Sequence, residues 1–81
     1  MPSLEDQIEA ERKKVRRLQF MMSMVMSVIG QNDNMPIEEA SELIASARQA
    51  ALTMFPGKEL AYDLLYRPRF QRLLHEKYQL Q

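Results

Sequence analysis

The chain has 81 residues, enough for one small domain in which a single hydrophobic core is only marginally stabilising. Its eleven basic and eleven acidic side chains cancel, so the overall charge favours neither nucleic acid nor an anionic membrane as a partner. The absence of cysteine excludes disulfides, thiolate catalysis and the usual structural zinc sites, and the single histidine, His75, argues against a histidine-built metal centre. We therefore expect no metal site and no cofactor.

The first predicted helix covers Leu4–Ile29 and is the longest in the chain. Ser3 is its expected N-cap, with Asp6 completing an approximate capping box, and Gly30 is expected to end it. At 1.5 Å per residue this helix is about 39 Å long. We expect its N-terminal part, about residues 1–15, to project from the single domain that the whole chain forms.

The second predicted helix opens at Asn34 or Met35, with Pro36 in its first turn. The sequence Phe55-Pro56-Gly57 is expected to stop it. Its predicted buried side is rich in alanine, which would let a bulky methionine helix approach closely.

A third segment, Lys58–Tyr66, meets a break at Arg67-Pro68, where either a kink or a new helix is expected, and the last segment should reach about Tyr78. The alternating pattern of a β-strand is absent from the sequence. These segments predict an all-α fold: a small antiparallel helical bundle with a long first helix, a second helix and a proline-interrupted third layer.

The stretch LQFMMSMVMSVIG, residues 18–30, holds four of the seven methionines. Placed on a helix, its apolar side chains sweep an arc of roughly 240°, and two neighbouring helices would cover about 200° of it. We therefore expect part of this surface to contact another chain. The predicted association surface contains Phe20, Met21, Met24 and Val28, extended by Leu4, Ile8 and Val15.

Apolar positions along the first helix also follow alternating steps of four and three, interrupted at Glu11, which is the repeat of a coiled coil. This pattern predicts a homodimer and leaves parallel and antiparallel pairing open. Two other interpretations are that the whole arc lies in the core of a monomer, or that the flexible methionine side chains receive a protein or peptide partner. Our leading hypothesis is a protein–protein interaction or adaptor module that associates through this helix.

Two basic clusters, residues 12–17 and 67–72, support an alternative hypothesis of a nucleic-acid-binding accessory protein. Charges of the first cluster encircle the helix and can pair with nearby acidic residues, which is typical of a solvated helix. In the second cluster, Arg67, Arg69 and Arg72 could contact an anion or nucleic acid around a helix start, whereas Tyr66 and Phe70 are expected in the core.

Catalytic residues are not evident. His75 and Glu76 are sequence neighbours and point to different sides of a helix, and Asp63 has no accompanying nucleophile or second carboxylate. We expect a non-enzyme. About twelve apolar positions in residues 18–29 fall short of the roughly 20 that span a bilayer, and no secretory signal pattern is present, so we expect a cytoplasmic protein without a membrane span.

Overall fold

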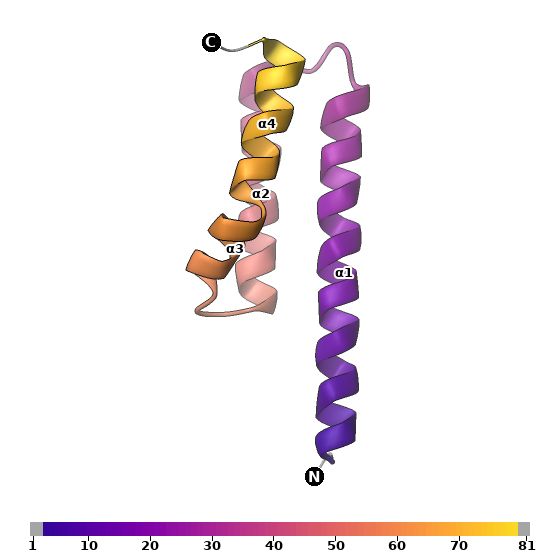
Figure 1. The fold of residues 1–81 in the computed structure, drawn as a ribbon. Coiled ribbons are helices and arrows are strands. Elements are labelled where there is room, and N and C mark those ends of the chain that lie inside the picture. Colours follow the sequence, from indigo (N-terminus) through magenta and orange to yellow (C-terminus); the bar gives the residue numbers. More distant parts are fainter. Residues whose placement is uncertain (1–2, 80–81) are drawn as a thin grey trace.

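The structure is a computed structural model that describes residues 3–79, which form four α-helices and no strand (Figure 1). The helices are α1 (Leu4–Gln31), α2 (Ile37–Met54), α3 (Glu59–Leu65) and α4 (Arg67–Tyr78). Successive long helices run in opposite directions, so that α1 and α4 point one way and α2 the other (Figure 1). The predicted all-α antiparallel bundle with an interrupted third layer is confirmed.

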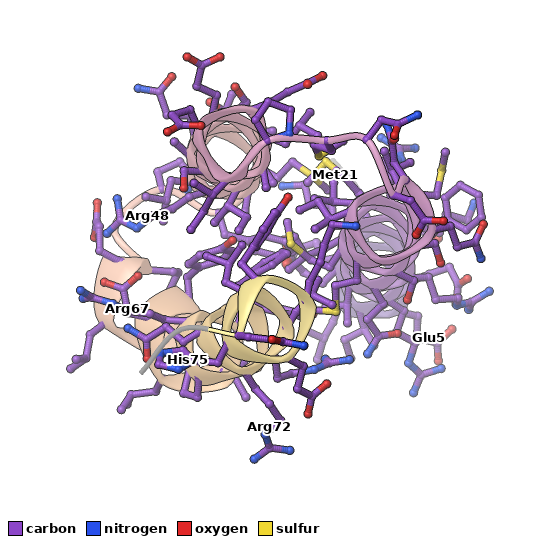
Figure 2. All side chains as sticks on the ribbon, turned by 90° about the horizontal axis from the view of Figure 1, so that it is seen from above. Glu5, Met21, Arg48, Arg67, Arg72 and His75 are labelled. Carbon is purple, nitrogen blue, oxygen red and sulfur yellow. The ribbon has the colours of Figure 1, made fainter. Side chains whose placement is uncertain are left out.

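The long helices form a triangle in cross-section, because α4 packs against both α1 and α2, which also pack against each other (Figure 2). The sequence predicts the third layer but does not indicate that it contacts both of the other helices. Helix α4 contacts both because it fills the groove between the first two helices, which buries its apolar side against both of them.

The capping box at the start of α1 is present as predicted: the Asp6 amide donates to Ser3 Oγ (3.2 Å) and the Ser3 amide donates to Asp6 Oδ2 (3.3 Å). Gly30 does not end the helix, which continues to Gln31 with Asn32 as its C-cap. The side chain of Asn32 accepts a hydrogen bond from the Asn34 amide (3.1 Å), so an Asn-based turn stops the helix.

The later boundaries are also set by turn residues. Helix α2 starts at Ile37, later than predicted, because Pro36 is its N-cap and its carbonyl accepts from the amides of Glu39 and Ala40. After α2, Gly57 adopts a left-handed conformation with φ of 77°, which supports the predicted stop.

Pro68 lies in the first turn of a new helix, α4, and does not kink α3. Its missing amide proton costs nothing there, because amides in the first turn have no partner within the helix. The carbonyl of Tyr66 accepts from the Phe70 amide (3.0 Å), which starts α4 directly after α3.

The core contains two groups of buried side chains. One surrounds Met22 and includes Ala47, Ala51, Tyr62, Tyr66 and Phe70, and the other comprises Ile29, Met35 and Ala40. Small alanines of α2 allow α1 to approach closely, as predicted, and the Tyr62 hydroxyl donates to Met22 Sδ (3.7 Å). The predicted core positions Tyr66 and Phe70 are buried.

Helix α1 is longer than its neighbours. Its 28 residues span about 42 Å, against about 27 Å for the 18 residues of α2. Residues 4–17 are all exposed, and Figure 1 shows this half of α1 extending past α3. The molecule is correspondingly elongated, with extents of 51 × 22 × 16 Å.

Candidate association surface

Helix α1 exposes large apolar side chains in two groups. We call Leu4, Ile8 and Val15 the seam, and Phe20, Met24 and Val28 the outer stripe. Leu4 is 71% exposed and Phe20 is 67% exposed, and the other four members are between 41% and 50% exposed. Contiguous exposed apolar side chains of this size commonly mark interaction sites.

The seam and the outer stripe lie on opposite sides of α1. At about 100° per residue, the seam follows the side that carries the buried residues Met22 and Ile29, whereas the outer stripe is centred about 180° away. The sequence predicts one association surface that contains all six residues. The structure separates them into two surfaces that no single partner helix can cover together.

Met21 does not belong to either exposed surface, although it was predicted as an association residue. Its side chain is partly buried against the core group around Met22, on the side of α1 that faces α2 (Figure 2). Met21 is covered because the α1–α2 contact lies over one edge of the methionine arc.

The sequence predicts no exposed apolar group on α3, yet its three leucines, Leu60, Leu64 and Leu65, face solvent. They are 65–73% exposed because α3 has only seven residues and packs inward through Tyr62. An apolar side chain in such a short helix has no periodicity long enough to reveal its direction.

An apolar pocket of about 250 Å³ connects the seam with α3. It lies where α1 leaves the bundle, between Val15 and Leu18 of α1 and Ala61 and Leu65 of α3, with Leu52 and Phe55 also in its wall. Val15 therefore belongs to both the seam and the pocket. The apolar surface of the projecting half of α1 thus leads directly to the end of the bundle.

The basic cluster at residues 12–17 is partly neutralised along α1. Lys14 Nζ lies 3.7 Å from Glu11 Oε1, and Arg16 Nη2 lies 3.8 Å from Glu9 Oε1. Both pairs are solvent-exposed, where such contacts contribute little to stability.

The three arginines of the second cluster are exposed and point in different directions. Arg67 and Arg72 leave α4 on different sides (Figure 2), and the guanidinium carbon of Arg69 lies 5.6 Å from the centre of the Tyr66 ring. Their side chains do not converge on one concave site.

Asp63, weighed as a candidate base, holds α3 to α2. Arg48 Nε donates to Asp63 Oδ1 (2.9 Å) and Arg48 Nη2 donates to Oδ2 (3.1 Å). These hydrogen bonds hold the pKa of Asp63 below its ordinary value and raise the pKa of Arg48. Both carboxylate oxygens of Asp63 accept hydrogen bonds from Arg48, which lies on α2, 15 residues earlier in the sequence. The sequence does not reveal this contact.

Within residues 3–79, no group of acidic and histidine side chains is arranged to hold a metal ion. None of the helices described there is long and apolar enough to cross a membrane. Comparison with protein-family models, with curated proteins and with solved structures found no match.

Proposed function

We propose that this protein is a self-associating interaction module that uses α1 as its contact helix. The observation that supports the proposal is that α1 exposes six large apolar side chains on two opposite faces. Each such side chain gains roughly 1.5–3 kcal/mol when fully removed from water, before the costs of association are subtracted. Burial of either face against a second chain would therefore contribute favourably to association, in proportion to the exposed area that is covered.

Two separate faces suit an adaptor. One face can pair with a second copy of the chain while the other remains accessible to a protein or peptide partner. Met24 in the outer stripe supports this role, because its unbranched thioether side chain can repack around partners of different shape. Leu65 of α3, which lines the apolar pocket together with Val15, adds exposed apolar area beside the seam.

The decisive experiment is sedimentation equilibrium over a dilution series. The expected result is a mass that rises from the 9.5 kDa of the monomer towards twice that value as concentration increases. Seam variants (Ile8→Gln with Val15→Gln) and stripe variants (Phe20→Gln with Met24→Gln) then assign the face. Ser23→Gln is the matched control, because Ser23 is exposed and polar. A mass of 9.5 kDa at all concentrations would contradict self-association.

The nucleic-acid alternative has weaker support, because the exposed arginines of α4 diverge and the basic residues of α1 have acidic neighbours. A salt-titrated binding assay on generic RNA and DNA separates the two hypotheses. Affinity that falls steeply with salt would favour the alternative, and absence of binding at low salt would remove it.

A further inference from the structure

We propose that two copies of the chain pair in antiparallel orientation through their seams, with Leu4 of each copy packed beside Val15 of the other. This inference rests on the proposed self-association and specifies its face, orientation and register. The starting observation is that residues 4–17 of α1 are exposed, while the seam lies on the side that the bundle covers farther along the same helix. A second helix can therefore take the place that the bundle leaves free.

The spacing of the seam fixes one antiparallel register. Leu4, Ile8, Glu11 and Val15 are separated by steps of four, three and four, so they occupy alternating core positions of a heptad repeat. If Leu4 lies opposite Val15 of the second copy, then Ile8 lies opposite Glu11 of that copy. Leu4 and Glu11 occupy one of the two core positions of the heptad, and Ile8 and Val15 occupy the other. Each contact between the two copies therefore joins one position of each kind, as in an antiparallel coiled coil. The arrangement is two-fold symmetric, so each contact occurs twice.

The same register brings Leu4 to the apolar pocket of the second copy. That pocket has a volume of about 250 Å³ and includes Val15, Phe55 and Leu65 in its wall. Leu4 is the most exposed of the large apolar side chains on α1, at 71%. Its insertion beside Val15 would remove both residues from water and close the pocket at each end of the paired segment.

Charge distinguishes antiparallel from parallel pairing. The first half of the projecting segment carries Glu5, Asp6, Glu9 and Glu11, and the second half carries Arg12, Lys13, Lys14, Arg16 and Arg17. Antiparallel pairing lays the acidic half of each copy along the basic half of the other, and it places Glu5 beside Arg12 of the second copy. Parallel pairing in register would align like charges and face the two Glu11 side chains across the seam.

The paired segment is short, about 18 Å for residues 4–15, so the buried area is smaller than the roughly 800 Å² per partner of a standard stable interface. We therefore expect a reversible dimer, with dissociation in the micromolar range. The outer stripe lies on the opposite side of α1 and stays accessible in this dimer.

Cysteine cross-linking tests the register directly, because the chain contains no cysteine of its own. Leu4→Cys and Val15→Cys variants are mixed in equal amounts and oxidised mildly at a concentration where the unmodified protein dimerises. The expected product is a covalent dimer that contains one chain of each variant. Neither variant alone should cross-link, because identical positions are about 16 Å apart in this register, beyond the roughly 7 Å that a disulfide can bridge. Leu4→Cys mixed with Met24→Cys is the matched control and should give no product.

The possible outcomes distinguish this inference from the proposed function. Self-cross-linking of Leu4→Cys alone would indicate parallel pairing and overturn the inference. A dimer by sedimentation without a product from the Leu4→Cys and Val15→Cys mixture would also overturn it, but would leave self-association intact. A monomer at all concentrations would overturn both.

A charge exchange provides an independent measurement. Glu5→Arg and Arg12→Glu should each weaken dimerisation about fivefold to tenfold, since each converts two attractive contacts into two repulsive ones. The double variant should return the dissociation constant to near its original value. Residues seven apart can form an ion pair within one helix, as Glu9 and Arg16 do, so restored affinity is assigned to contacts between chains only if the helix content of the dilute monomer is the same in all three variants. Additive losses in the double variant would contradict the register.

Discussion

The two halves of α1 carry one apolar repeat and meet different environments. In the C-terminal half, Met22 and Ile29 are almost completely buried between α2 and α4. In the N-terminal half, the seam residues follow the same side of the helix and are exposed, because α2 is about 15 Å shorter than α1. The repeat therefore determines which side of a helix is apolar, whereas the lengths of its neighbours determine where that side is covered.

Truncation of one apolar side chain in each half should give the largest contrast. Met22→Ala is expected to reduce the free energy of unfolding by about 2–5 kcal/mol, because it leaves a cavity in the core. Ile8→Ala should change it by less than about 0.5 kcal/mol in the monomer. Urea unfolding at a protein concentration below the dissociation constant of the dimer measures both changes in the free energy of unfolding.

Met22→Leu, which nearly conserves volume, is the control for the core position. An equal loss of stability from Ile8→Ala in the dilute monomer would show that the N-terminal half is packed, and the comparison would fail.

The close approach of α1 and α2 gives the next largest effect. Ala47→Leu should cost about 1–3 kcal/mol, because the larger side chain would enter the core group that contains Met22. Ala50→Leu on the same helix is the control, since Ala50 is exposed. Thermal unfolding compares the two variants, and equal midpoints would contradict the tight packing between α1 and α2.

Loss of the capping box should destabilise only the projecting half of α1. Ser3→Ala removes a cap that contributes about 1 kcal/mol, so the first turns of α1 should fray. Amide hydrogen exchange in residues 5–9 should accelerate, while the midpoint of thermal unfolding stays unchanged.

Ser46→Ala on the exposed side of α2 serves as the comparison for this change. A lowered unfolding midpoint for Ser3→Ala alone would mean that the projecting half and the bundle unfold together.

The contact between α2 and α3 gives the smallest expected effect, and it depends on pH. Because Arg48 holds the pKa of Asp63 below its ordinary value, the ion pair contributes stability that is fully present above about pH 4. That stability is lost as the pH falls through the lowered pKa. Asp63→Asn should therefore flatten the decrease in melting temperature on acidification.

Arg48→Met is the control for this pair. It should flatten the decrease in melting temperature on acidification to the same extent as Asp63→Asn. The double variant should resemble each single variant. An unchanged acid response in Asp63→Asn would show that the ion pair contributes nothing to stability in solution.

Local features of the chain were largely predictable. Proline and glycine mark the ends of α2 and the start of α4 because they restrict or permit backbone conformations within a few residues. The capping box at Ser3 and the alanine-rich side of α2 follow from equally local patterns. Gly30 misled the prediction, because a glycine can continue a helix when the Asn32 turn supplies the stop.

Periodicity in the sequence therefore predicts the helices, their order and the apolar side of each long helix, because periodicity is a property of a single helix. Only the tertiary structure decided that α4 fills the groove between α1 and α2, that Arg48 binds Asp63, and that the leucines of α3 face outward. It also decided that Met21 is covered and that Phe20 and Met24 are not. The physical reason is that coverage depends on the lengths and contacts of segments distant in sequence.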